Sequence, residues 1–181
     1  MDLEKILPKD GPPIDEVSKY IEKYKNDLIV IKYGGNVFID RKIFDNFITD
    51  INTLNKLGIS FTVVHGGGPR IKRELDKSNI QSKFIRGLRV TDEKIINIVE
   101  SVLIDFNNDI VDSLKKFGTD AVSMHTKKNN IIKVTPEAKE LGFVGIPNKI
   151  DNNLIEKILN KKQVPIISPL GLGSCLLYTS P

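Results

Sequence analysis

The chain has 181 residues and a mass of 20.3 kDa, and 40% of its residues are hydrophobic, which suits one domain or lobe with one core. One cysteine and two histidines exclude a disulfide scaffold and a Cys/His zinc site. The net charge of +4 comes from scattered lysines and arginines, which suits small anionic ligands better than nucleic acid. Because the sequence shows neither an apolar stretch long enough to cross a membrane nor a signal peptide, we expect a cytoplasmic protein.

Residues 1–26 form a leader that contains one amphipathic helix. Its apolar side chains recur at helical spacing, at Ile14, Val17, Ile21 and Tyr24. Residues 28–33 then read LIVIKY, a compact run that predicts a strand buried on both faces. A glycine pair, Gly34 and Gly35, ends this strand.

A helix, a strand and a second helix come next. Asp40 is the predicted N-cap of a helix whose apolar face continues until Gly58 stops it. Residues 59–64 predict a second buried strand, which is followed by His65 and three glycines. Pro69 suits the first turn of another helix, because a missing N–H is tolerated there.

The second half of the chain continues this alternation. The patterns first predict a small hairpin over 83–90 and a long helix that is capped by Thr91 and stopped by Gly118. A strand over 121–124 follows, then a hairpin turn at 128–130 with a strand over 131–134 on its far side. The last predicted elements are a strand near 143–144, a helix from Asp151 to about residue 160, and a buried strand over 164–168. Such alternation favours an α/β fold with a mainly parallel sheet covered on both faces.

Two strand–glycine–helix junctions carry the first chemical signal, one over residues 32–36 and one over residues 65–69. In a parallel sheet both lie at the carboxyl ends of strands, where ligands bind. Glycines let phosphate groups approach backbone N–H groups beside a helix N-terminus, and Lys32 can reach the same anion. The alternative is that the glycines only make tight turns, but two such junctions with a lysine favour an anion site.

Other glycine motifs do not occur in the sequence. It contains no GxxxxGK[ST] phosphate loop, no GxGxxG dinucleotide motif and no GxSxG nucleophile. A dinucleotide-binding fold and an esterase of the α/β-hydrolase fold are therefore disfavoured.

Arg89 lies just before the long predicted helix. Its planar guanidinium can hold a carboxylate through two hydrogen bonds. A surface arginine beside Asp92 is the alternative, and the local sequence alone favours it. His65 and His125 are interpreted as structural residues, His65 at the end of a strand.

Four motifs, in this order and at these separations, resemble the N-terminal lobe of the amino acid kinase family: IKYGGN, VVHGGGP, GLRVTD and ELGFVG. The resemblance runs from about residue 28 to residue 173, and GLRVTD together with YGGN points to the acetylglutamate kinases within the family. It implies a three-layer αβα sandwich. The implied activity uses ATP with Mg²⁺ to phosphorylate the side-chain carboxylate of N-acetyl-L-glutamate in arginine biosynthesis.

The same resemblance implies roles for individual residues. Lys32 would stabilise the transferred phosphoryl group, and the N–H groups of Gly34, Gly35 and Gly67 would contact phosphate oxygens. Gly67 and Gly68 would approach the acyl substrate, and Arg89 would hold its α-carboxylate. No residue is expected to be a metal ligand.

The resemblance divides the chain into a leader (1–26), an acyl-amino-acid-binding lobe (27–173) and a tail (174–181) that departs from the family pattern. We expect the tail to be non-native and the ATP-binding lobe, with its nucleotide site, to be missing, so that the chain alone is inactive. The resemblance also implies a homo-oligomer, either a dimer or a hexamer joined through the N-terminal helix.

Two alternatives stay open. The acceptor can be a related acylated amino acid such as N-acetyl-aminoadipate, or the chain can be a non-catalytic ligand-binding lobe. In every case the expected partner is a small molecule and neither nucleic acid nor a membrane.

Overall fold

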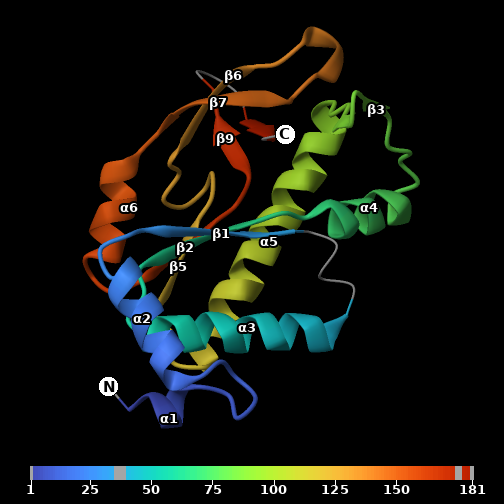
Figure 1. Ribbon diagram of the computed structural model, residues 1–181. Helices are drawn as coiled ribbons and strands as arrows, with labels where there is room; N and C mark the ends of the chain where they lie inside the picture. Colours follow the sequence, from blue (N-terminus) through green and yellow to red (C-terminus); the bar gives the residue numbers. More distant parts are fainter. Residues whose placement is uncertain (1, 35–39, 174–176, 180–181) are drawn as a thin grey trace.

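A computed structural model of the chain describes residues 2–34, 40–173 and 177–179 (Figure 1). The helices are α1 (Leu3–Ile6), α2 (Ile14–Tyr24), α3 (Arg41–Lys56), α4 (Gly68–Lys77), α5 (Glu93–Lys116), α6 (Asn152–Leu159) and the 3-10 helix η2 (Lys139–Leu141). The strands are β1 (Ile29–Tyr33), β2 (Phe61–His65), β3 (Phe84–Ile85), β4 (Leu88–Arg89), β5 (Ala121–Met124), β6 (Ile132–Pro136), β7 (Gly145–Ile150), β8 (Val164–Ile167), β9 (Leu170–Leu172) and β10 (Leu177–Thr179). Within these described ranges, no helix is long and apolar enough to cross a membrane.

A central sheet of four parallel strands organises the fold, in the order β1-β2-β8-β5. The register pairs Tyr33 with His65, so β1 and β2 end at the same level. The N–H of Gly66 donates to the carbonyl of Tyr33 at 2.8 Å. Gly34 and Gly66 therefore follow the two strands at the same edge of the sheet, where α4 begins (Figure 1).

Helices cover both faces of this sheet. On one face, α3 and α5 pack their apolar sides against the strands, and Phe106 and Ile110 of α5 are fully buried there. On the other face, Ile155 and Ile158 of α6 join a second core with Ile167 of β8. The predicted αβα sandwich with a mainly parallel central sheet is confirmed.

The strand β1 is an edge strand, which the sequence did not predict. Its neighbour Leu28 is 46% exposed and Val30 is 62% exposed, whereas Tyr33 is buried. The prediction of a strand buried on both faces is therefore wrong for residues 28–33. The reason is its place in the sheet: β1 pairs with β2 on one side, while α6 packs on β8 two strands away.

A second, mixed sheet has the order β10-β9-β6-β7 and corrects two predictions. Residues 131–134 do not pair with residues 121–124, because β6 pairs antiparallel with β7 while β5 lies in the central sheet. Only His125 and Lys128 form a bridge at the predicted hairpin turn. The strand expected near residues 143–144 begins two residues later, as β7.

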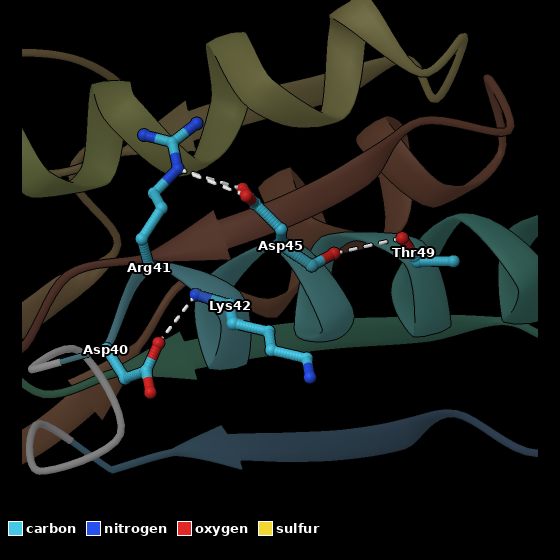
Figure 2. Close-up of polar contacts among 5 residues, drawn as sticks. All are labelled: Asp40, Arg41, Lys42, Asp45 and Thr49. Atoms are coloured by element: carbon cyan, nitrogen blue, oxygen red, sulfur yellow. Dashed lines mark hydrogen bonds and ion pairs between the residues drawn. The ribbon is translucent and has the colours of Figure 1, made fainter.

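Helix α3 begins as its sequence predicts. The Asp40 carboxylate accepts a hydrogen bond from the backbone N–H of Lys42 at 2.7 Å (Figure 2). Arg41 and Asp45 form an ion pair across one turn, and the Thr49 hydroxyl donates to the Asp45 carbonyl at 2.9 Å. The Asp40 contact satisfies a backbone N–H at the helix start that has no partner within the helix, and the other two contacts lie within the helix.

Helix α5 begins one residue later than predicted. Its N-cap is Asp92, whose carboxylate accepts from the N–H of Ile95 at 2.8 Å. Thr91 is buried, and its hydroxyl donates instead to the carbonyl of Arg89 at 3.0 Å. The prediction of Thr91 as the cap is therefore wrong, because its side chain is held by the hairpin that precedes the helix.

Replacing the cap tests this start. We expect Asp92→Ala to lower the free energy of unfolding by about 1 kcal/mol, because the Ile95 N–H loses its acceptor. Asp105→Ala, an exposed position in the middle of α5, is the matched control and should change stability little. Urea titration followed by circular dichroism measures both, and equal losses would argue against the cap.

Candidate functional site

A cavity of about 390 Å³ opens at the carboxyl ends of β1 and β2. Four elements supply most of its described walls: the end of β2, the start of α4, the β3–β4 hairpin and the first half of α5. Its lining residues are Lys32, Val64, His65, Gly66, Gly67, Gly68, Ile71, Phe84, Gly87, Leu88, Arg89, Thr91, Val99, Leu103, Val144, Pro169 and Thr179. The described lining contains two cations and no Asp or Glu, so it favours an anionic ligand.

His65 is a buried residue that holds the glycine segment. Its Nδ1 lies 3.0 Å from the Gly66 carbonyl oxygen, and its Nε2 lies 3.0 Å from the side-chain nitrogen of Asn107. Burial lowers the pKa of His65 from 6.5 to about 4, so its imidazole is neutral at physiological pH. His125 is also buried, and burial lowers its pKa. The buried positions of both histidines agree with their interpretation as structural residues.

Two glycines at the start of α4 have different reasons to be glycine. A Cβ on Gly67 would lie 2.4 Å from Cδ2 of Leu103 on α5, so the packing leaves no room for a side chain. A Cβ on Gly68 would meet nothing within 4 Å. Gly68 lines the cavity, and as the first residue of α4 its N–H has no intrahelical acceptor. A ligand can therefore approach the backbone there.

Two basic side chains approach the cavity from different strands. Lys32 on β1 is exposed, and Arg89 on β4 is half-buried. Arg89 donates to the hydroxyl of Ser82, and its guanidinium carbon lies 4.8 Å from the centre of the Phe84 ring. Burial lowers the pKa of Arg89, but a guanidinium keeps its charge at neutral pH. Arg89 is thus a wall of the cavity, where a planar cation can bind a carboxylate.

The structure brings most of the predicted site residues together. Lys32, Gly67, Gly68 and Arg89 line one cavity, although up to 57 positions separate them along the chain. Gly34 is exposed and is not among the described residues that line it. Gly35 lies outside the described residues.

Sequence reasoning missed several walls of this cavity. Thr91 lies within the GLRVTD motif, which was the available signal for it, whereas Phe84 lies three residues before that motif. Val144 and Thr179 also line the cavity and form an isolated β-bridge with each other, and no local sequence pattern predicts such a bridge. Asn107 had one signal, a polar residue within the apolar stripe of a helix.

Comparison with known proteins gives this site its context. Residues 27–177 match the amino acid kinase family. The chain belongs to the amino acid kinase family. It is 51% identical over 171 residues to a protein named acetylglutamate kinase from Pelagibacter ubique, and 39% identical over 174 residues to one of the same name from Clostridium acetobutylicum. These alignments cover 94% and 91% of this chain but 59% of each relative, so the chain spans about three fifths of their length.

Solved structures agree on the amino acid kinase fold. The smu.665 protein of Streptococcus mutans superposes with a TM-score of 0.76 at 26% identity, over 85% of this chain and 63% of that one. An N-acetylglutamate synthase from Neisseria gonorrhoeae superposes with a TM-score of 0.79 at 20% identity, over 91% of this chain and 39% of that one. The second likeness concerns the fold alone.

Alanine at the two adjacent glycines separates packing from ligand access. We expect Gly67→Ala to lower the free energy of unfolding by about 1–3 kcal/mol, because its Cβ meets Leu103. Gly68→Ala should keep the stability of the parent chain, since the added Cβ enters open space, and should weaken ligand binding in the cavity. Thermal unfolding and calorimetric titration with N-acetyl-L-glutamate measure the two effects. A stable Gly67→Ala variant would contradict the close packing on α5.

Proposed function

We propose that this chain forms the acyl-amino-acid-binding lobe of an acetylglutamate kinase, which phosphorylates the side-chain carboxylate of N-acetyl-L-glutamate with ATP. One observation carries the proposal: a single cavity collects Lys32, Arg89 and an open glycine backbone. Such a lining suits a ligand with two anionic ends, as N-acetyl-L-glutamate has. The shared name of the two similar curated relatives supports the same activity.

Arg89 is proposed to hold the α-carboxylate of this substrate. Its guanidinium is oriented by Ser82 and by the ring of Phe84, which limits the side-chain freedom that binding would otherwise cost. The apolar part of the lining, with Ile71 and Leu103, suits the acyl group and the methylenes of the substrate. N-Acetyl-aminoadipate, which has one more methylene, remains the alternative acceptor.

Lys32 is proposed to neutralise charge at the transferred group. Phosphoryl transfer depends on positioning and electrostatics more than on covalent chemistry by the protein. The N–H groups of Gly34, Gly35 and Gly67 are proposed to bind phosphate oxygens, and the open space at Gly34 fits a phosphate against the backbone. ATP would supply the phosphoryl group, and Mg²⁺ would accompany its phosphates, as in other kinase sites.

Self-association through the leader is a further part of the proposal. Helix α2 has one buried residue, Val17, among those described, whereas Ile14 is 42% exposed and Tyr20 is 51% exposed. An amphipathic helix with apolar residues left in solvent is suited to packing against another chain. This supports the division into a leader (1–26) and a ligand-binding lobe (27–173) within a homo-oligomer.

The carboxylate contact is tested by Arg89→Lys. We expect N-acetyl-L-glutamate to bind about 1–3 kcal/mol more weakly, because a lysine cannot reproduce a planar two-bond contact. Arg86→Lys, in the exposed turn of the same hairpin, is the matched control and should bind as the parent does. Calorimetry on this chain with N-acetyl-L-glutamate and N-acetyl-aminoadipate measures affinity and identifies the preferred acceptor. Unchanged affinity in Arg89→Lys would remove Arg89 from the site.

The phosphoryl role is tested by Lys32→Ala in a polypeptide of the relatives' length, made by fusing residues 1–173 to the remainder of the Pelagibacter protein. We expect kcat to fall by at least about 10²-fold with little change in the KM for the acyl substrate, as for an interaction made mainly in the transition state. Lys42→Ala, on the exposed side of α3, is the control. Trapping of the acyl phosphate measures turnover. If the parent fusion binds the acyl substrate without turnover, the non-catalytic reading is favoured.

A further inference from the structure

The segment that lines the cavity at Gly66 and Gly67 is tied to the protein interior by two buried polar side chains. His65 is 1% exposed and Asn107, in the middle of α5, is 0% exposed. Asn107 reaches two partners with the same nitrogen: His65 Nε2 at 3.0 Å and the carbonyl oxygen of Ile166 on β8 at 2.8 Å. One amide group thus joins α5, β8 and the end of β2.

The partners determine where the protons lie. The Ile166 carbonyl only accepts, so the group of Asn107 that faces it must be the NH₂. That same NH₂ then donates to His65, so Nε2 must carry no proton. The imidazole proton is therefore on Nδ1, where it donates to the Gly66 carbonyl. The hydrogen-bond direction runs from α5 through His65 to the glycine segment.

The same helix holds the next residue by packing. Leu103, one turn before Asn107, lies against the backbone of Gly67. The N–H of Gly66 is used by the carbonyl of Tyr33. The N–H and the carbonyl of Gly66 are thus both hydrogen-bonded, and Leu103 packs against Gly67. The peptide groups that face the cavity therefore have one orientation.

We propose that His65 and Asn107 are positioning residues that orient the glycine backbone for the acyl substrate, and that they do so only while His65 is neutral. This inference rests on the proposed function for the identity of the ligand. A second proton on His65 would place an N–H against the NH₂ of Asn107, and turning the amide would place its oxygen against the Ile166 carbonyl. Either change breaks the connection to α5.

The direction of the pH effect follows from the surroundings of His65. The titratable groups that face it are Arg70 on α4, which pairs with Asp109 of α5 at 2.6 Å, and His125 after β5. Burial lowers the pKa of His65 to about 4; the hydrogen bond to the Gly66 carbonyl raises it, and the charges of Arg70 and His125 lower it further. The neutral form that orients the glycines is therefore present at neutral pH and is lost as the pH falls toward 4. Substrate binding should weaken over that range.

Nitrogen-15 NMR on this chain tests the proton positions without any variant. We expect His65 to show an unprotonated Nε2 and a protonated Nδ1 at pH 7. Observing the proton on Nε2 would overturn the proposal. This NMR measurement does not involve the ligand, so it tests the positioning role separately from the proposed function. A failure of the proposed function would instead appear as no binding of N-acetyl-L-glutamate.

Two substitutions test the consequence for binding. In Asn107→Leu the donor is lost, so we expect a mixture of His65 tautomers, shifted amide signals of Gly67 and Gly68, and about tenfold weaker binding of N-acetyl-L-glutamate. Asp105→Leu places a leucine at an exposed position two residues earlier on α5 and should leave all three as in the parent. Parent-like tautomer, amide signals and affinity in Asn107→Leu would overturn the proposal.

His65→Asn isolates the pH dependence. The asparagine amide can still donate to the Gly66 carbonyl but does not titrate. We expect its binding of N-acetyl-L-glutamate to lose less affinity than the parent between pH 7 and pH 4, and the comparison cancels the titration of the ligand itself. The same acid loss in both proteins would overturn the role of His65.

Discussion

The closeness of α5 to the end of β2 is the constraint on which the site depends. Leu103 occupies the space that a side chain on Gly67 would need, so the backbone itself forms the wall of the cavity at that point. A wall made of peptide groups presents N–H donors at a helix start, where the aligned peptide dipoles favour negative charge. The apolar packing of one helix thus creates a polar surface suited to an anion.

Burial and charge are arranged differently on the two sides of this wall. On the interior side, His65 and Asn107 are neutral and hydrogen-bonded, which avoids the cost of a charge in an apolar core. On the cavity side, Lys32 and Arg89 keep their charge, one exposed and one half-buried against Phe84. The cavity therefore presents positive charge without carrying charge into the core.

Sequence patterns were most successful where local chemistry decides the structure. Asp40 and Asp151 cap their helices as predicted, and Gly58, with a φ of +74°, ends α3 in the left-handed conformation that favours glycine. Errors arose where a distant segment competes. Thr91 was expected to be a cap, but its hydroxyl donates to the Arg89 carbonyl and its N–H to the distant Leu141 carbonyl, and Asp92 caps the helix.

Strand pairing shows the limit of the sequence more clearly. Alternation predicts that residues 131–134 form a strand, but it does not indicate which strand pairs with it. In the structure β6 pairs with β7 and β9, which come later in the chain and are brought to it by tertiary packing. The edge position of β1 could not be predicted for the same reason, because an apolar sequence run is the same whether one face of the strand or both faces are buried. Side-chain periodicity records which residues are apolar and not which element covers them.

The sequence by itself determined most of the elements, the caps Asp40 and Asp151, the glycine junctions and the candidate residues Lys32, Gly67, Gly68 and Arg89, because these depend on neighbours a few positions apart. Only the tertiary structure decided that those residues share one cavity, that Gly67 is packed against α5 while Gly68 is open, and that His65 is joined to Asn107. These relations depend on contacts between segments tens of residues apart. Such contacts are set by how whole helices and strands pack, and no local pattern encodes them.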